Sequence, residues 1–384
     1  FFAPLFATAA TTDAEVLNRR LPWLNTINQR IFLNLLFEDF SLGQRKGIRS
    51  RFVASLEKDK VQFDTIEVNL EGASIRGVAS FNQKDDLPLL TTQLHVSDYN
   101  LNSLFGTGHI QHPVPRGNMV PVWSSQPWET SFLRGYDSKM SIQIDRATHD
   151  SFSAKNLSFE AESTNGEWSI ENIKADMWGG TLQSNVHLDV SSVPTFTTSF
   201  YLTNIRLEAF LKSLAGFEGL QGLSSLSAEI SSSGISAADF VKNANGSVAF
   251  KGRDILLQGF DLASLVQTVP AVRSVADVVN TVRIATLRGF SSFSIVEGGF
   301  YFSQGALGTQ GITFRSRHAL GSYVGSIDLM RWIIQAAIQF KLISIATDEY
   351  PAVTVTLKDS LDQPIIDLDA RSLEAWVARQ KLIQ

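Results

Sequence analysis

The chain has 384 residues, with 33 basic and 38 acidic side chains and a formal net charge of −5. A chain of this length has room for several structural units, and a hydrophobic content of 44% is typical of a folded protein. The composition therefore argues against disorder and against a generally basic nucleic-acid surface. The complete lack of cysteine excludes disulfides, thiolate metal sites, iron–sulfur clusters and cysteine nucleophiles.

The first residues indicate a fragment or a processed product. The sequence begins at Phe1 without a signal-peptide pattern, so we expect any membrane anchor to lie upstream of it. The apolar runs Phe1–Ala10 and Trp332–Ile338 are shorter than the roughly 18 to 20 residues that a membrane-crossing helix needs. A helix is predicted from Asp13 to about Leu35, and residues 1–31 are assigned to an N-terminal helical segment.

Residues 32–105 are predicted to form a first β module. Ile66, Val68 and Leu70 alternate with polar residues, which is the pattern of a strand with one buried face. Glycine and asparagine punctuate such runs along the chain, as they do at the hairpins of an antiparallel sheet. On this basis we predict hairpin turns at Asn165-Gly166, Gly179-Gly180 and Glu297-Gly298-Gly299.

Residues 138–260 are predicted to form a second β module, because the pattern of the first recurs there. Phe63, Ile66, Val68 and Gly72 line up with Ile170, Ile173, Ala175 and Gly179, which lie 107 positions later. After a one-residue deletion the match continues to two predicted short helices, one after Leu101 and one after Leu207. A weaker third copy starts near Phe293.

Residues 106–137 are assigned to a Pro- and Gly-rich crossover linker between the two modules. Within it, His109 and His112 are three positions apart, as in a metal-binding pair. Because no third histidine or carboxylate is close to them in sequence, we predict no metal site.

Residues 261–289 are predicted to be helical, with a break at Pro270. Asp261 is a good N-cap residue, and proline suits the first position of a helix but not its interior. Beyond the proline, apolar residues fall near one helical face: Val272, Val275, Ala276, Val279 and Val282. This stripe is expected to cover one end of the sheet; the alternative is that it gates lipid entry or rests on a membrane surface.

Residues 290–384 are assigned to a C-terminal β module that ends in a helix over Ser372–Lys381. The whole chain contains no phosphate-binding loop, no zinc-protease motif and no nucleophile elbow, and its six histidines form no constellation. We therefore predict a protein that is not an enzyme and needs no cofactor. The basic run Arg45, Lys46, Arg49 and Arg51 is interpreted as a solvated hairpin tip, with contact to anionic lipid headgroups or an acidic partner as the alternative.

These features predict a mainly β fold of repeated, strongly curved antiparallel sheet modules that form an elongated groove, with a few short helices. The helices are too few to cover the apolar face of such a sheet, so that face must pack against a second sheet, itself or a ligand. A β-sandwich is one solution, and a curved sheet that holds acyl chains is the other. In the second case the lipid-facing candidates are Ile66, Val68, Leu70, Ile173, Ala175, Met177, Val186, Leu188, Phe200 and Leu202.

Three stretches, taken in order, resemble the AsmA-like family. Gly166–Val190 reads as a glycine turn, an alternating strand, Gly-Gly and a second alternating strand that ends in Leu-Asp, as the modules of that family do. Leu220–Gly234 and Phe240–Leu262 follow in the order found in the family. The resemblance covers roughly residues 140–384 and, through the internal repeat, reaches back to about residue 32.

The resemblance implies a function in the bacterial envelope. The AsmA-like family consists of membrane-anchored proteins with long β-rich regions, related to the bridge-like lipid-transfer proteins. Membership would imply phospholipid transfer and outer-membrane assembly, with phospholipid bound in the apolar groove and a membrane surface or a membrane-protein complex as partner, but no nucleic acid. The alternative function is a scaffold or accessory subunit of a membrane protein complex without lipid transport of its own.

The resemblance also implies a location. A member of this family would lie in the periplasm, anchored to the inner membrane by a segment that this sequence does not contain. The alternative is a mitochondrial or other bacterial-derived compartment.

Overall fold

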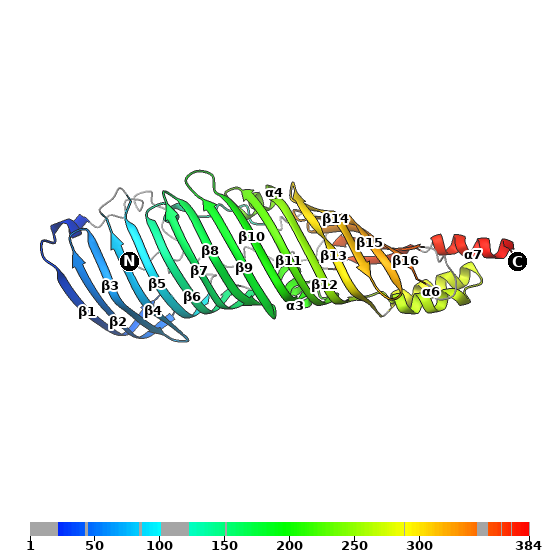
Figure 1. Ribbon diagram of the computed structural model, residues 1–384, viewed down its shortest axis with the longest axis horizontal. Coiled ribbons are helices and arrows are strands. Elements are labelled where there is room, and N and C mark those ends of the chain that lie inside the picture. Colours follow the sequence, from blue (N-terminus) through cyan, green and yellow to red (C-terminus); the bar gives the residue numbers. More distant parts are fainter. Residues whose placement is uncertain are drawn as a thin grey trace.

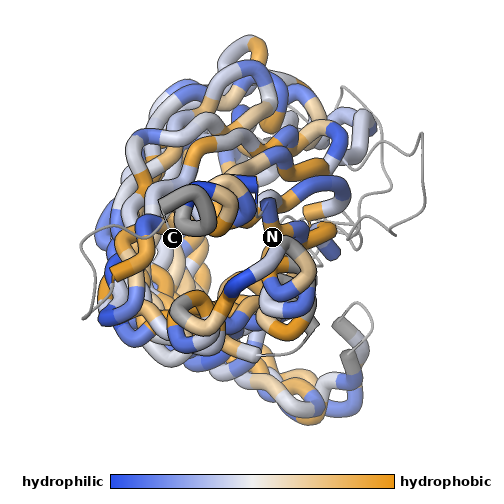
Figure 2. The backbone as a smooth tube through the Cα atoms, turned by 90° about the vertical axis from the view of Figure 1, so that its right-hand side faces the viewer, coloured by the Kyte–Doolittle hydropathy of each residue, from blue (hydrophilic) through white to orange (hydrophobic). Residues whose placement is uncertain are grey.

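The described residues fold into one long, open sheet and lie mainly in strands, which confirms the mainly β fold class. The computed structural model describes residues 22–42, 45–83, 87–100, 123–149, 152–287, 289–343, 352–361, 363–369 and 371–383. Viewed along its long axis, the sheet curls so that one of its faces is turned inward (Figure 2). Within the described ranges, no helix is both long and apolar enough to cross a membrane.

The structure describes 18 strands, and each pairs with the next one in the sequence, so their order in space follows the chain (Figure 1). The first nine are β1 Ile31–Leu42, β2 Arg45–Glu57, β3 Lys60–Leu70, β4 Ala73–Asn82, β5 Leu89–Asn100, β6 Asp137–His149, β7 Phe152–Thr164, β8 Glu167–Met177 and β9 Gly180–Asp189. The other nine are β10 Thr195–Arg206, β11 Leu220–Ser233, β12 Asn245–Gln258, β13 Phe290–Ser303, β14 Ala306–Arg315, β15 Ala319–Asp328, β16 Ile333–Leu342, β17 Ala352–Ser360 and β18 Ile365–Asp369. All of these pairings are antiparallel except β5–β6, which is parallel.

The sequence repeat is a structural repeat. β2, β3 and β4 begin and end 107 positions before β7, β8 and β9, respectively. The register shift between Phe63 and Ile66 in the β3–β4 pair recurs between Ile170 and Ile173 in the β8–β9 pair. The two modules therefore share their strands and their β-bulge, and together they form one continuous sheet.

Two of the three predicted glycine turns are hairpins. Asn165 and Gly166 both have positive φ between β7 and β8, as a two-residue type I′ turn requires. Trp178 and Gly179 form the equivalent turn, one position before the predicted Gly179-Gly180, because Gly180 already begins β9.

The prediction of a hairpin at Glu297–Gly299 is wrong, because these residues lie inside β13. A register shift between Glu297 and Gly299 marks a β-bulge, at which Gly298 has a φ of 153°. The hairpin itself is formed by Gln304 and Gly305, which follow β13 and have φ values of 50° and 76°. A bulge glycine and a turn glycine look alike in sequence, since both are chosen for backbone freedom.

Two further expectations are corrected at the level of the fold. The helix predicted from Asp13 to about Leu35 is wrong for its described part, because Pro22–Thr26 form only a short 3₁₀ turn, residues 27–30 are not helical, and β1 begins at Ile31 and pairs with β2. The β-sandwich alternative is also wrong, because the described strands belong to a single sheet that curls on itself. The short helix predicted after Leu101 lies outside the described residues, as do His109 and His112.

Helices lie at a few places along the sheet: α3 Leu207–Ala215, α4 Ala237–Lys242, α5 Leu262–Thr268, α6 Val275–Leu287 and α7 Arg371–Ile383. There are also short 3₁₀ turns, η2 Pro22–Thr26, η3 Ser131–Leu133 and η4 Val269–Ala271. The predicted break at Pro270 is confirmed, since η4 separates α5 from α6. Asp261 caps α5, its carboxylate accepting a hydrogen bond from Ser264 N–H at 2.8 Å.

The predicted apolar stripe is met at one of its positions and not at another. Val272, just before α6, is buried as predicted, whereas Ala276 is exposed. The buried positions described on α6 are Val278, Thr281 and Ala285, which have the three- and four-residue spacing of a helix face. Valine and alanine occur around much of the helix, so composition alone does not distinguish its two sides.

Candidate functional site: the inner face of the sheet

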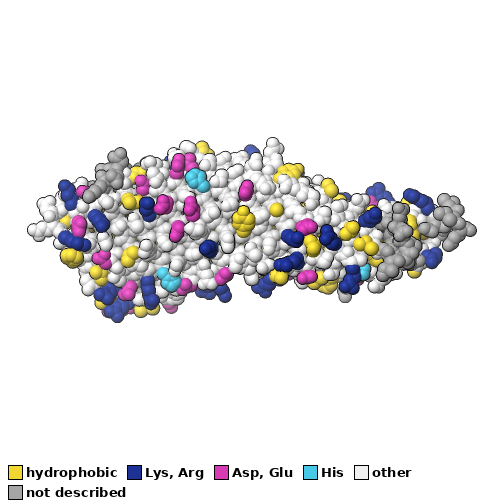
Figure 3. All heavy atoms as spheres, in the orientation of Figure 1, with side chains coloured by type: hydrophobic (Ala, Val, Ile, Leu, Met, Phe, Trp, Pro, Cys, Tyr) yellow, Lys and Arg dark blue, Asp and Glu magenta, His cyan; other side chains and the backbone are white. Residues whose placement is uncertain are grey.

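The inward-turned side chains of the strands form the inner face, which is the candidate site. Figure 3 shows one outside view of the molecule, in which charged side chains lie over the strands and apolar side chains are scattered among them. The large clusters of buried apolar residues are formed by the inner face. Burial of this face varies along the molecule, and three regions differ in what covers the side chains.

The N-terminal region, β2 to β8, covers its inner face with its own side chains. Ile66 of β3, Ile75 of β4, Leu94 of β5 and Ile144 of β6 belong to one buried cluster. Phe52 and Phe63 meet edge to face at its margin, with ring centres 6.2 Å apart. The curl of the sheet brings these strands close enough for their side chains to fill the space between them.

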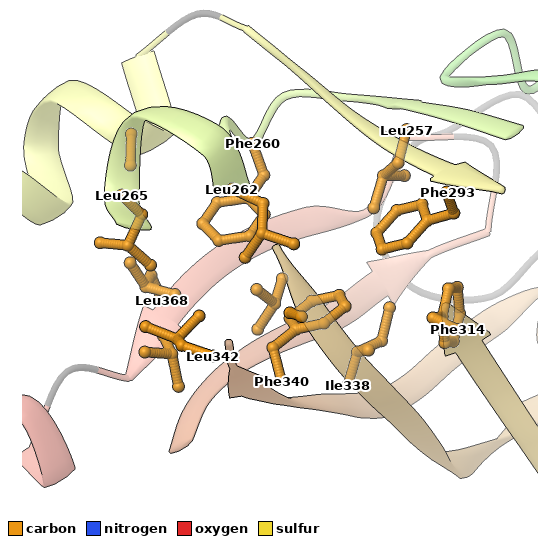
Figure 4. Close-up of a cluster of buried hydrophobic side chains, with 14 of the residues drawn as sticks. Leu257, Phe260, Leu262, Leu265, Phe293, Phe314, Ile338, Phe340, Leu342 and Leu368 are labelled. Atoms are coloured by element: carbon orange, nitrogen blue, oxygen red, sulfur yellow. The ribbon is translucent and has the colours of Figure 1, made fainter. Parts of the chain in front are cut away.

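The C-terminal region, β13 to β18, is filled by helices and by the sheet (Figure 4). Phe340 of β16 stacks on Phe293 at 5.7 Å and on Phe260 at 6.0 Å, and all three rings are fully buried. Leu262 and Leu265 of α5 complete the cluster. This end of the inner face is therefore closed by protein, in agreement with the expectation that the 261–289 segment covers one end of the sheet.

The middle region, β9 to β12, is the part of the inner face that is covered least. A cross-strand row runs along it through Ser184, Phe200, Ala228 and Val248, and continues to Phe300 of β13. In this row only Ala228 is fully buried, and the other side chains are partly exposed. A parallel row through Val186, Thr198 and Ile230 is also partly exposed. An apolar surface therefore stays accessible between two filled ends.

Hydroxyl groups on the inner face of the middle region are satisfied by the protein itself. Ser184 Oγ donates a hydrogen bond to Ser199 O at 3.0 Å, and Thr198 Oγ1 donates one to Asn185 O at 3.0 Å. Ser232 Oγ donates one to Phe240 O at 2.6 Å. Because these hydroxyls are directed to backbone carbonyls, the surface that they leave is close to apolar.

One rim of the sheet carries the second half of the crossover between β5 and β6, residues 123–136. Trp123 Nε1 donates a hydrogen bond to Leu329 O at 2.7 Å, and its ring meets Trp332 edge to face. Trp128 stacks on Phe240 with ring centres 4.7 Å apart. Trp168 Nε1 of β8 donates to Leu133 O at 3.0 Å. This segment, the rim strap, therefore runs from the β15–β16 turn past α4 and β8 to β6.

All ten predicted lipid-facing residues lie on the inner face, but the structure does not place them in one environment. Ile66, Val68, Leu70, Ala175 and Leu202 are buried, and the first four belong to the N-terminal cluster. Ile173, Met177, Val186, Leu188 and Phe200 are partly exposed at or beside the middle region. The first group is already covered by protein. The second group keeps some exposed surface, but Met177 also packs against the N-terminal cluster and Leu188 against the cluster around Trp168.

Sequence reasoning missed the part of the middle region beyond β10. Val248 and Phe250 of β12 and Phe300 of β13 continue the apolar inner surface, and Phe250 stacks on Phe300 at 5.9 Å. Their alternation with polar residues is a signal of an inner face, but these strands have no repeat partner at 107 positions to support it.

The accessible surface of the middle region is lined mainly by apolar side chains. No group of three or more metal-ligating side chains occurs among the residues that the structure describes. Lys46, Arg49 and Arg51 of the basic run are exposed on β2, as expected for solvated charges. Burial raises the pKa of the Tyr323 phenol to about 12, which keeps that group neutral in the C-terminal cluster.

Comparison with known proteins supports the family resemblance. The family model described as AsmA family matches residues 52–294, more than half of the chain. A search among curated proteins found no significant match, and a search among solved structures found none either. The family is associated with the bacterial envelope and suggests a function related to lipid transfer. The match begins within β2, covers the rest of both repeated modules and reaches the start of the C-terminal region, and the chain therefore belongs to the AsmA family.

Proposed function

We propose that the protein binds lipid without catalysis and that acyl chains lie along the inner face of the middle region, β9 to β12. The observation that carries the proposal is the row of partly exposed apolar side chains through Phe200 and Val248, between two ends that are filled by protein. Acyl chains cover such side chains as well as protein does, because the hydrophobic effect depends on apolar area and not on its source.

The size of the surface suits an acyl chain. From β9 to β13 there are four strand spacings of about 4.8 Å, so the row measures roughly 19 Å along the molecule. Half of a bilayer's hydrocarbon core is about 15 Å thick. The acyl chains of one phospholipid would therefore fit along the row, with the headgroup at a rim of the sheet.

The test is native mass spectrometry of protein purified without harsh detergent, comparing Val186→Asp with His187→Asp. Val186 points inward and His187 points outward on the same strand. The two variants therefore introduce the same charged side chain on the same strand and differ in whether it lies on the inner or the outer face. We expect bound phospholipid on the unchanged protein and on His187→Asp. We expect at least about a tenfold loss of occupancy on Val186→Asp, because a carboxylate does not favour contact with an acyl chain.

Two results would contradict the proposal. One is an unchanged protein without bound lipid, and the other is full occupancy on a folded Val186→Asp variant. Either would favour the second candidate function, a scaffold or accessory subunit of a membrane protein complex. The observation in favour of that function is the N-terminal cluster, where Ile66, Val68 and Leu70 are already covered by protein.

The cellular setting is the part of the proposal that rests on family membership. We propose that the protein acts in the periplasm, held at the inner membrane by a segment outside this sequence, and contributes to phospholipid transfer and outer-membrane assembly. Deletion of the gene should then alter the phospholipid content of the outer membrane. Restoration by the unchanged protein but not by Val186→Asp would tie that effect to the inner face.

A further inference from the structure

β1, the first strand of the sheet, has a counterpart in the second repeat, and the comparison shows that β1 lacks a second neighbouring strand. β1 and β6 occupy equivalent places in the two repeats, because Leu35 pairs with Phe52 in one and Ile142 pairs with Phe159 in the other, each 107 positions later. β6 is paired on both sides, with β5 and with β7. Among the described strands, β1 pairs with β2 alone.

The inward side chains of β1 are more exposed than those of β6, as expected for a strand without a second neighbour. Ile142 and Ile144 of β6 are 8% and 6% exposed. Their equivalents in β1, Leu35 and Phe37, are 39% and 47% exposed. The difference comes from β5, which covers β6 and has no described counterpart on β1.

We propose that the edge of β1, which pairs with no described strand, binds a β-strand of a partner protein in parallel, as β6 binds β5. A long edge strand with apolar residues on both faces is unusual, since exposed edges are normally shortened or charged. The other edge of the sheet is protected in that way: β18 has 5 residues and contacts α6. This inference goes beyond lipid binding and does not depend on it.

The repeat also indicates the chemistry of the partner strand. Asp145 Oδ1 of β6 lies 2.7 Å from His95 Nε2 of β5, and Arg146 of β6 forms an ion pair with Asp98 of β5. The equivalent positions of β1 hold Glu38 and Asp39. The partner should therefore be apolar on its inward positions and should carry a cation where β5 carries Asp98.

A strand fits this edge better than a lipid surface does. The outward residues Phe32 and Leu36 are 70% and 50% exposed, so apolar area alone would also suit a bilayer. The unpaired N–H and C=O groups of an edge, however, cannot enter hydrocarbon without a large cost, and a partner strand satisfies them. Hydrogen bonds between these backbone groups and a partner strand would be the main source of binding affinity.

The test uses a synthetic peptide of residues 88–100, with Asp98→Lys in the peptide and a nitroxide at its N-terminus, added to the full chain. Because the chain contains no cysteine, Asn34→Cys or Ser41→Cys provides a single site for a fluorophore on β1. In the parallel register the nitroxide lies about 15 Å from position 34 and about 38 Å from position 41. We expect saturable quenching at position 34 and little at position 41.

Controls separate edge pairing from non-specific association. Leu35→Lys, which directs a charge inward at the edge, should weaken peptide binding by at least about tenfold, while Ile365→Lys on β18 should leave it unchanged. If Leu35→Lys does not fold by circular dichroism, Phe37→Lys takes its place. The peptide that retains Asp98 should bind about fivefold more weakly than the Asp98→Lys peptide.

Several results would overturn the proposal. They are the absence of saturable quenching, stronger quenching at position 41 than at position 34, and equal effects of Leu35→Lys and Ile365→Lys. Self-association of the chain that Leu35→Lys abolishes would assign the edge to a second copy instead. Binding to phosphatidylglycerol vesicles that Leu35→Lys abolishes, without peptide binding, would assign it to a membrane.

Discussion

Tyr323 places a polar hydroxyl group in the apolar C-terminal cluster. Its ring meets Phe300 edge to face at 6.1 Å, at the border between the middle and C-terminal regions. In the part of the chain that the structure describes, its hydroxyl is buried and has no hydrogen-bond partner. Burial without a partner disfavours the charged form, which is why the pKa of Tyr323 rises to about 12.

This raised pKa predicts a loss of stability at alkaline pH. An unfolded tyrosine ionises near pH 10, whereas Tyr323 in the folded protein stays protonated until about pH 12. Between these values the folded state binds more protons, so the free energy of unfolding falls as pH rises from about 10 to about 12, by on the order of 2 kcal/mol. Urea unfolding of the unchanged protein and of Tyr323→Phe over this range measures the difference.

The control in this experiment is the comparison below pH 9. There Tyr323→Phe should be as stable as the unchanged protein or slightly more stable, because removal of an unpartnered hydroxyl removes a desolvation cost. A large loss of stability in Tyr323→Phe at neutral pH would mean that the hydroxyl makes a bond and would refute the assignment.

Among the elements, the bulge in β13 shows how one glycine shapes a strand. A Cβ built on Gly298 would lie 2.6 Å from Gly311 O and from Ile312 Cα, both on the backbone of β14. Backbone atoms cannot move aside as a flexible side chain can. The bulge therefore depends on glycine for two reasons, the φ of 153° and the close approach of β14.

We predict that Gly298→Ala destabilises the protein by about 2 to 4 kcal/mol and that Gly311→Asn is nearly neutral. Gly311 has a φ of 62°, which asparagine adopts readily, and a Cβ there meets nothing within 4 Å. Chemical denaturation of both variants measures the difference. Similar destabilisation by the two substitutions would show that backbone conformation, and not the approach of β14, is the constraint.

The sequence predicted the elements best where a local pattern repeats. The strands of the two modules were found because their alternation and their turn glycines recur 107 positions apart, and the bulges recur with them. The sequence predicts a turn at Gly298, but the role of this residue depends on β14, which lies beside it in space and not in sequence. The sequence predicts a helix at the start of β1, but pairing with β2 overrides the local preference.

The candidate site was predictable only in part, for a related reason. Alternation assigns Val186 and Ile66 to the same face of the sheet, and both do lie on the inner face. Whether that face is covered depends on the curl of the sheet and on distant elements such as α5. The contacts of the rim strap, such as Trp123 with Leu329, join residues 206 positions apart and leave no periodic signal.

At the scale of the whole molecule, each strand contacts its sequence neighbours, as in a repeat protein. The two large clusters of buried residues lie at opposite ends and share no member. Between them, the middle region contributes few buried inward side chains. An arrangement of this kind transmits stability from one end to the other only through β9 to β12 and the rim strap.

We therefore predict that the two ends unfold separately. Phe340 and Ile66 are fully buried, one in each cluster, and their replacement by alanine should cost about 2 to 5 kcal/mol locally. Hydrogen exchange at increasing urea should show that Phe340→Ala lowers the protection of β14 to β17 and leaves β3 to β6 unchanged, with the reverse for Ile66→Ala. Equal loss of protection at both ends in either variant would mean that the middle region couples them into one cooperative unit. In that case the partly exposed row through Phe200 would have to be more tightly packed in solution than its exposure indicates, and less of the inner face would be open to a ligand.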